Sequence, residues 1–261
     1  MIDIHSHILP YIDDGSNSIE HSLRQLKQAE EGGVSTIYLT SHYFPGHYQY
    51  TRPEYDEKLD ALRGQAKAAG LKIKLSSGFE VFIQPGILKD IKEHSLTLGD
   101  SPYVLIESEL NGLPSDFYAN VYPLLRAGYK PILAHAERYV SIMRKPERAR
   151  ELADRNIHIQ SNAGAILGHY GEKVRQTAWI LLENGWTHFL ASDDHVRGEY
   201  GALFEASKLI EERIDGRTAE LLTLGFPAKI ETGEDIPYSY VRVKSSRHKP
   251  KKKSLLRRIF G

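Results

Sequence analysis

Histidine and aspartate residues are spaced two apart at the start of the chain, within the segment DIHSHILPYIDDG (residues 3–15). In an extended strand, side chains two residues apart lie on the same face, so His5 and His7 are predicted to point into one pocket. Two imidazoles with a carboxylate such as Asp14 close behind are typical ligands of a transition metal. A surface strand that carries two histidines by chance would show the same short pattern, so the metal interpretation depends on the rest of the chain.

Further potential ligands lie at the ends of short apolar segments that are rich in β-branched residues. The C-terminal ends of the strands are where active sites form in parallel βα barrels. A single histidine or glutamate at such a position is most often a hydrogen-bonded or solvated residue. Six of the seven predicted strands nevertheless end in a potential ligand, which favours one shared metal cluster. The nine predicted ligands are His5, His7, Asp14, His42, Glu80, Glu107, His135, Asp193 and His195.

Seven strands that alternate with helices are needed to position these ligands. Such alternation favours a parallel sheet. No glycine-rich dinucleotide fingerprint follows the first strand, so a closed barrel is favoured over a doubly wound sheet. We expect one α/β domain over residues 1–235. The predicted strands are 2–5, 34–40, 72–76, 103–107, 131–135, 157–161 and 187–192, and the predicted helices lie near 17–33, 52–70, 86–93, 116–127, 146–155, 172–184, 201–213 and 216–224.

The composition is that of an ordinary globular protein, with 261 residues, 41% hydrophobic and 26% charged. There is no cysteine, which excludes disulfides, cysteine-ligated zinc and phosphatases or proteases with a cysteine nucleophile. No segment is long and apolar enough to span a membrane, and the N-terminus does not resemble a secretory signal. These features are compatible with a cytoplasmic location.

The charge is unevenly distributed along the chain. Residues 236–261 contain nine Lys and Arg and no acidic residue, whereas the first 235 residues contain 25 Lys and Arg against 34 Asp and Glu. An acidic body with a basic end does not indicate a nucleic-acid binder. We expect residues 236–261 to be a flexible tail, and such a tail can weakly contact an anionic membrane surface or an acidic partner.

The predicted ligand set comprises five imidazoles and four carboxylates without a thiolate, which suits Zn, Mn or Fe better than Mg, Ca or Cu. Nine ligands are too many for one ion and fit two or three. A pocket with several divalent ions attracts a dianion, and adjacent metals activate water and neutralise charge on phosphoryl oxygens. Arg138 follows His135 by three residues and is placed to bind phosphate oxygens. A salt bridge to a nearby acid is the alternative role for Arg138.

The motifs MIDIHSHILP, IDDG, TSH, AHAER and ASDDH, in this order and spacing, resemble the PHP (polymerase and histidinol phosphatase) superfamily. Within it, residues 1 to about 235 are similar to the tyrosine-protein phosphatases of bacterial capsule and exopolysaccharide loci, the CpsB/YwqE type. The resemblance implies a distorted seven-stranded parallel βα barrel. It also implies three divalent metal ions, usually described as manganese, with zinc or iron as alternatives.

The resemblance further implies how the site is used. It groups His5, His7 and Asp193 on one metal, Glu80 as a bridge to a second metal with Glu107 and His135, and Asp14, His42 and His195 on a third. The implied reaction is hydrolysis of phosphotyrosine by a metal-bridging hydroxide, with departure of the tyrosine phenolate. The implied partner is the C-terminal tyrosine cluster of a membrane-associated tyrosine autokinase that regulates polysaccharide synthesis.

The chain departs from the usual family pattern around the pocket. Ala136 stands where relatives often have proline, and Tyr200 stands where they often have arginine, which leaves Arg197 as the nearest substitute. Tyr43 stands where some relatives have a second histidine. With its aromatic neighbours, Tyr43 is predicted to line the mouth of the pocket and stack on a phosphotyrosine ring, unless this is only an exposed loop. Arg197 and Tyr43 are therefore the predicted substrate contacts.

Three other functions fit parts of the sequence. A histidinol-phosphate phosphatase would use the same metal chemistry, but the short N-terminus and the basic tail favour the tyrosine phosphatase. A metal-dependent amidohydrolase usually has lysine at the end of strand four, where this chain has Glu107. A non-catalytic binding module would have lost some ligands, and all nine are present.

Overall fold

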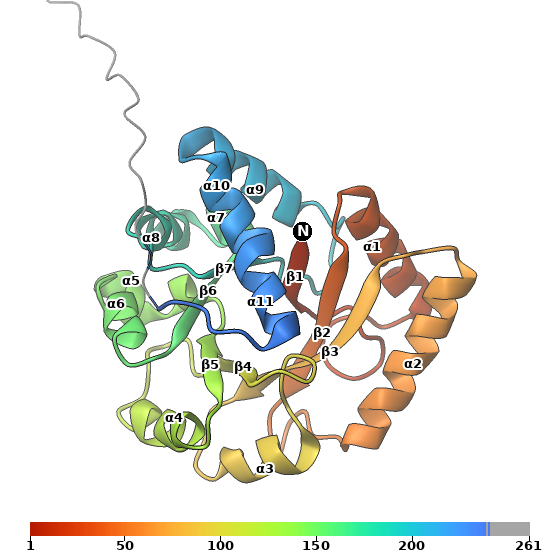
Figure 1. Ribbon diagram of the computed structural model, residues 1–261, viewed down its shortest axis with the longest axis horizontal. Helices are drawn as coiled ribbons and strands as arrows, with labels where there is room; N and C mark the ends of the chain where they lie inside the picture. Colours follow the sequence, from red (N-terminus) through yellow and green to blue (C-terminus); the bar gives the residue numbers. More distant parts are fainter. Residues whose placement is uncertain (239, 241–261) are drawn as a thin grey trace, which may run out of the picture.

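Seven strands form a barrel in the computed structural model, which describes residues 1–238 and Tyr240 (Figure 1). The strands are hydrogen-bonded in chain order, and each pairs with the next in parallel. The predicted parallel α/β barrel is therefore confirmed. The strands are β1 (Ile2–Ser6), β2 (Thr36–Tyr43), β3 (Lys74–Phe82), β4 (Tyr103–Glu107), β5 (Lys130–Leu133), β6 (His158–Asn162) and β7 (Phe189–Ala191).

The barrel closes between β1 and the segment that follows β7. The backbone N–H of Asp193 donates to the carbonyl of His5 at 2.9 Å, and that of His7 donates to the carbonyl of Asp194 at 2.8 Å. Three of these four residues are predicted ligands, and the fourth, Asp194, lies between the predicted ligands Asp193 and His195. These two hydrogen bonds therefore hold the predicted ligands that follow β1 next to those that follow β7.

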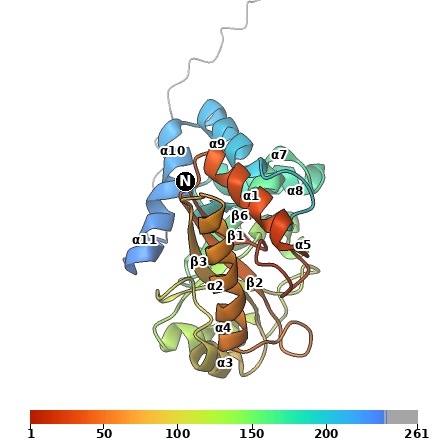
Figure 2. The same cartoon turned by 90° about the vertical axis from the view of Figure 1, so that its right-hand side faces the viewer.

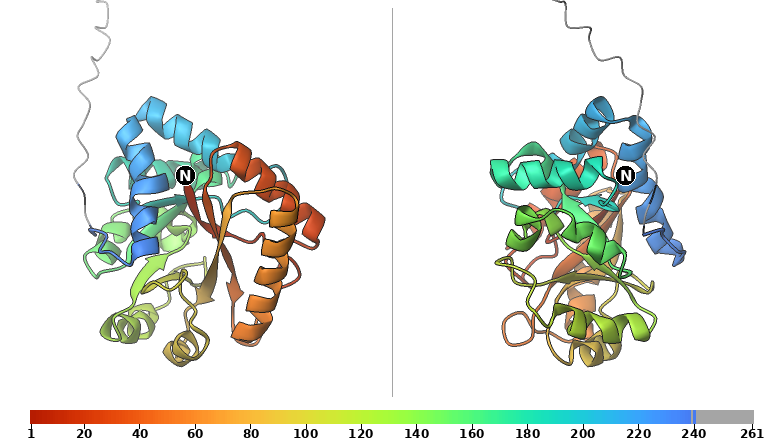
Figure 3. Two further views of the ribbon diagram at one scale, coloured as in Figure 1. Left: turned by 45° about the vertical axis from the view of Figure 1, so that its right-hand side comes forward. Right: turned by 90° about the vertical axis from the view of Figure 1, so that its left-hand side faces the viewer.

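Helices surround the barrel on its outer side (Figures 1 and 3). The longest, α2, begins with a capping box in which the Thr51 hydroxyl and the Glu54 carboxylate each accept from the other's backbone N–H, which satisfies donors at the open helix end. The helices are α1 (Ile19–Glu31), α2 (Arg52–Ala68), α3 (Ile87–His94), α4 (Phe117–Arg126), η1 (Ala136–Arg138), α5 (Val140–Arg144), α6 (Arg148–Ala153), α7 (Ala163–Leu167), α8 (Glu172–Glu183), α9 (Ala202–Arg213), α10 (Gly216–Glu220), η2 (Leu221–Gly225) and α11 (Phe226–Thr232). Among the described residues, no helix is both long and apolar enough to cross a membrane.

Strands β2 and β3 are longer than predicted. They continue to Tyr43 and Phe82, so His42 and Glu80 lie within the strands and pair with each other in register. The polar sequence Ser-Ser-Gly in β3 resembles a loop. In the barrel, however, Gly78 permits close packing, since a Cβ there would lie 2.8 Å from the side chain of Thr40.

The C-terminal segment packs on the barrel beyond the boundary expected after residue 235. Ile236 is buried, and its backbone N–H donates to the hydroxyl of Tyr103. His158 and His188 hold the same segment through their Nε2 atoms, which lie 3.0 Å from the carbonyl oxygens of Ile236 and Tyr238. The segment follows no helical or strand pattern, which is why the sequence did not place it in the domain. The predicted flexible tail with its membrane contact otherwise lies outside the described residues.

The burial of His158 predicts that the folded protein is less stable in acid. Burial lowers the pKa of His158 to about 4, below the ordinary value of about 6.5, so the folded protein binds fewer protons than the unfolded chain. The contribution of His158 to the free energy of unfolding is complete above pH 6.5 and is lost as the pH falls toward 4. By proton linkage it amounts to roughly 1–2 kcal/mol between pH 7 and pH 5.

The variant His158→Gln keeps a donor for the Ile236 carbonyl but cannot be protonated. We expect the free-energy difference in urea unfolding between wild type and variant to shrink or reverse from pH 7 to pH 5. A difference that stays constant over this range would contradict the assignment.

Candidate metal centre

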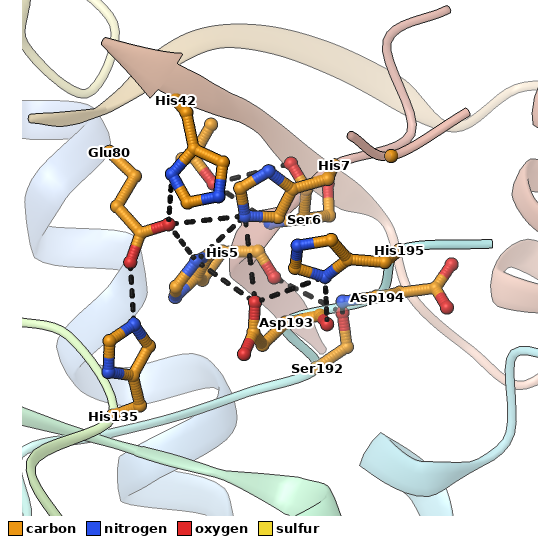
Figure 4. A network of polar contacts seen from close by, with 12 residues as sticks. His5, Ser6, His7, His42, Glu80, His135, Ser192, Asp193, Asp194 and His195 are labelled. Atoms are coloured by element: carbon orange, nitrogen blue, oxygen red, sulfur yellow. Dashed lines mark hydrogen bonds and ion pairs between the residues drawn. The ribbon is translucent and has the colours of Figure 1, made fainter. Parts of the chain in front are cut away.

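All nine predicted ligands meet at the C-terminal ends of the strands. Figure 4 labels each of them except Asp14 and Glu107. Seven of them line a pocket of about 210 Å³, and His5 and His7 lie beneath it, fully buried. The structure therefore brings together every residue of the predicted set. Their role as ligands stays a prediction that the geometry below supports.

His5, His7 and Asp193 form the first group of converging atoms. The two Nε2 atoms lie 3.1 Å apart, and Asp193 Oδ1 lies 3.3 Å from that of His5 and 3.5 Å from that of His7. The two histidines share a face of β1, as their spacing predicted. Two imidazole nitrogens and a carboxylate oxygen that face one point suit a divalent cation.

Glu80 lies at the centre of the cluster. Its Oε2 atom is 3.2 Å from His5 Nε2 and 3.2 Å from His42 Nδ1, while its Oε1 atom is 2.7 Å from His135 Nε2. His42 Nδ1 also lies 2.9 Å from Glu107 Oε1. A carboxylate whose two oxygens face different histidines is suited to bridge two cations, which agrees with the role that the resemblance implies for Glu80.

The third group contains Asp14, His42 and His195, together with His7. Asp14 Oδ1 lies 3.5 Å from His42 Nε2 and 3.4 Å from His195 Nε2. The imidazoles of His7 and His195 are stacked, with ring centroids 4.0 Å apart. The grouping differs from the one that the resemblance implies, because His7 adjoins two groups and His42 adjoins the Glu80 and Glu107 carboxylates as well as Asp14.

The charges of the cluster fit cations. Burial lowers the pKa of His5, but the nearby carboxylates of Glu80 and Asp193 outweigh this and raise it to about 9. Burial raises the pKa of Glu80, and the facing histidines outweigh this and hold it well below its ordinary value. The contacts of Glu80 Oε2 with His5 and His42 lack hydrogen-bond geometry, so this buried oxygen has no hydrogen-bond partner among the described residues. Buried carboxylates thus need positive charge here, which protons on the histidines or divalent cations can supply.

Side chains outside the predicted set fix the orientation of the histidines. Asp13 Oδ2 lies 2.8 Å from His7 Nδ1 and accepts from the backbone N–H of His42. The Gln160 Oε1 atom accepts from the backbone N–H of His135, so the Nδ1–H of His5, 3.1 Å away, must donate to it. With a cation in place of the second imidazole proton, both histidines would direct an unprotonated Nε2 toward the cluster, as in metal sites with an outer shell of carboxylates and amides.

Hydrogen bonds from side-chain amides connect Gln160 to Asp193, a member of the first group of ligands. Gln160 Nε2 donates to Asn162 Oδ1 at 2.8 Å, and Asn162 Nδ2 donates to Asp193 Oδ2 at 2.6 Å. Both amides lie on β6, the one strand for which the sequence predicted no ligand. The feature of the sequence that could have indicated these two amides is the polar C-terminal end of β6, an otherwise apolar strand.

Two ligand positions have unusual backbone geometry. His135 and Asp193 adopt left-handed conformations, with φ of 35° and 53°. Such conformations cost a non-glycine residue of order 1–3 kcal/mol and occur mostly where function requires them. Ser192, the residue before Asp193, is held by the buried carboxylate of Asp3, which accepts from the backbone N–H and the hydroxyl of Ser192 and from the hydroxyl of Tyr200. Tyr200 is therefore buried against Asp3 and does not line the metal pocket.

The predicted substrate contacts have three different outcomes. Arg138 lines the pocket, donates to Asp193 Oδ2 at 3.2 Å and lies over the ring of Tyr170 at 5.0 Å. Arg197 also lines the pocket but is mostly exposed and donates to Asp14 Oδ2 at 3.0 Å. The placement of Tyr43 at the pocket mouth is wrong, because its side chain is fully buried beside Tyr50 on the face of β2 opposite to His42.

Comparison with known proteins gives a consistent result. The model of the capsular polysaccharide synthesis family CpsB/CapC matches residues 1–231. The chain is 33% identical to the putative tyrosine-protein phosphatase CapC of Staphylococcus aureus, over 75% of this chain and 77% of that protein. It is 30% identical to the tyrosine-protein phosphatase YwqE of Bacillus subtilis, over 85% and 89% of the two chains.

Solved structures extend the comparison. A chain from the crystal structures of YwqE of Bacillus subtilis and CpsB of Streptococcus pneumoniae, described as metal-dependent tyrosine phosphatases, superposes with a TM-score of 0.84 at 28% identity, covering 93% of this chain and 100% of that one. A histidinol phosphate phosphatase of Lactococcus lactis superposes with a TM-score of 0.55 at 16% identity, over 82% and 94% of the two chains. The second likeness shows a shared fold only.

Proposed function

Since the chain belongs to the CpsB/CapC family of capsular polysaccharide synthesis, we propose that it is a metal-dependent tyrosine phosphatase that hydrolyses phosphotyrosine on protein substrates. The observation that carries this proposal is the convergence of three adjoining ligand groups on one pocket beside Arg138. Divalent cations bound there would lower the pKa of water and neutralise charge on the phosphoryl group.

The side chains of the pocket would bind and orient the substrate. Arg138 is held by Asp193 and by the face of Tyr170, which fixes the guanidinium at the pocket wall. An arginine held in this way presents its remaining N–H groups to two phosphate oxygens at once. The Tyr170 ring, 40% exposed, adds an aromatic surface at the rim for the phenyl ring of the substrate.

We further propose three divalent ions, with manganese as the principal candidate and zinc or iron as alternatives. The nine ligands are all nitrogen and carboxylate oxygen donors, which suit these metals. The proposed partner is the tyrosine-phosphorylated tail of a membrane-associated tyrosine autokinase, consistent with membership of a capsule synthesis family. Because such a kinase uses ATP, we place the enzyme on the cytoplasmic side of the membrane.

A direct assay separates this function from the histidinol-phosphate alternative. The chain is stripped with a chelator, reloaded with Mn, Zn, Mg or Fe(II), and assayed on a phosphotyrosine peptide and on histidinol phosphate. We expect kcat/KM for the peptide to be higher by at least about tenfold, equal to about 1.4 kcal/mol of transition-state binding. The opposite preference would overturn the proposal, and metal binding without hydrolysis of either substrate would favour a binding module.

A further inference from the structure

A second hollow adjoins the metal pocket, between the loops that follow β1 and β2 and the exposed side of α2, the face of the molecule turned toward the viewer in Figure 2. Its volume is about 530 Å³. We call it the α2 groove. The side chains used below to define it are Tyr11, Tyr48, Glu57, Lys58 and Ala61.

The α2 groove and the metal pocket share a wall. Tyr48 lines the groove, and its ring stacks on the imidazole of His42 with the ring centroids 5.4 Å apart. His42 in turn lines the metal pocket. Both hollows are formed by loops at the C-terminal ends of strands, so a molecule bound at the metal centre can extend past Tyr48 into the groove.

The sizes of the two hollows indicate a substrate larger than a small phosphate ester. The metal pocket, at about 210 Å³, is below the roughly 300–1,000 Å³ of typical ligand pockets, whereas the α2 groove is within that range. A phosphate group with part of an aromatic ring would fill the smaller hollow. The rest of a phosphotyrosine-bearing chain must then lie outside it. Two hollows adjoin the metal pocket: the α2 groove, and a hollow of about 540 Å³ that shares Tyr170, Asp193 and His195 with the pocket. The α2 groove differs from the other hollow in its lining.

The groove presents an exposed aromatic side chain. Tyr11 is 58% exposed and has a left-handed backbone, with φ of 64°, fixed by a hydrogen bond from its N–H to the carbonyl of Ser16. Exposed aromatic residues in a rigid setting are typical anchors of protein interfaces. Lys58 Nζ lies 5.9 Å above the Tyr11 ring and keeps its positive charge. Two carboxylates, Glu54 and Glu57, line the groove beside this one ammonium group, so the net charge of the wall is negative.

We propose that the α2 groove binds the polypeptide next to the phosphotyrosine and selects apolar and basic side chains there. This inference rests on the proposed tyrosine phosphatase function. It makes the groove, and not the metal pocket, the determinant of which phosphotyrosine-bearing chains are dephosphorylated.

The test compares a phosphotyrosine peptide flanked by leucine and lysine with free phosphotyrosine, using the metal-loaded full chain. For the wild type we expect a KM for the peptide at least tenfold lower. Tyr11→Ala, which removes the anchor, and Ala61→Trp, which fills the groove, should reduce the ratio of the two KM values to below threefold. Tyr122→Ala and Ala68→Trp are matched controls, since Tyr122 is 60% exposed on α4, Ala68 is exposed on α2, and neither lines the groove.

The charge of the groove has its own test. A glutamate-flanked peptide should have a higher KM than the lysine-flanked one, and Glu57→Lys should reverse this order. Two results would overturn the proposed role of the groove while leaving the phosphatase function intact. One is that the wild type has equal KM values for free phosphotyrosine and both peptides. The other is that the groove variants behave like their controls. Failure of the wild type to hydrolyse any phosphotyrosine substrate would overturn the proposed function and this inference with it.

Discussion

Glu80→Gln is expected to lower kcat/KM on a phosphotyrosine peptide by at least about a thousandfold, which corresponds to about 4 kcal/mol of transition-state stabilisation. The substitution keeps the size of the side chain but removes the charge of the one carboxylate that faces His5, His42 and His135 together. An amide cannot balance two cations, so the bound metal should decrease as well. Metal content measured by mass spectrometry after dialysis gives a readout that is independent of activity.

Glu109→Gln is a suitable control for this change. Glu109 lies two residues after Glu107 but is exposed and outside the pocket, so both activity and metal content should match the wild type. Circular dichroism establishes that both variants are folded. A Glu80→Gln protein that is folded and keeps its full metal content would contradict the central position that we assign to this residue.

The convergence of the nine predicted ligands at one end of the barrel could be predicted from the sequence because its signal is local. His5 and His7 share a face through their spacing alone, and the other ligands follow or end apolar segments whose direction is fixed by the parallel topology. In the same way, Tyr43 could have been excluded as a pocket residue. It follows His42 directly in an extended strand, so the two side chains must point to opposite faces once β2 is known to reach Tyr43.

The outer shell could not be predicted in this way, because it depends on neighbours in space. Gln160 contacts the site because β6 lies beside β5, where its amide oxygen reaches both His5 and the backbone of His135. In the sequence alone, a glutamine at the end of a strand does not indicate a residue that orients metal ligands. The packing of Ile236 against Tyr103 is equally non-local, since it joins residues more than a hundred positions apart through a segment without regular structure.

Arg138→Ala is expected to lower kcat/KM by about a hundred- to a thousandfold, the usual cost of losing one preorganised donor to a transition-state oxyanion. The Arg138 side chain is 28% exposed, and its contact with Asp193 uses only one guanidinium nitrogen, which leaves the others for phosphate. Arg138→Lys should recover only part of the loss, because an ammonium group cannot bind two oxygens in the same plane. Inhibition by inorganic phosphate should weaken by at least tenfold in Arg138→Ala, since the product binds through the same contact.

Arg197→Ala tests whether the loss of activity in Arg138→Ala comes from the specific position of Arg138 or only from the removal of one positive charge at the pocket. The Arg197 side chain is 73% exposed, and its contact with Asp14 is a surface ion pair of the kind worth at most about 1 kcal/mol. Its loss should therefore change kcat/KM by less than about tenfold. If both arginine variants lose activity equally, the pocket attracts phosphate through its general charge. If Arg138→Ala also loses bound metal, Arg138 acts by holding Asp193 in place and not by binding the phosphate.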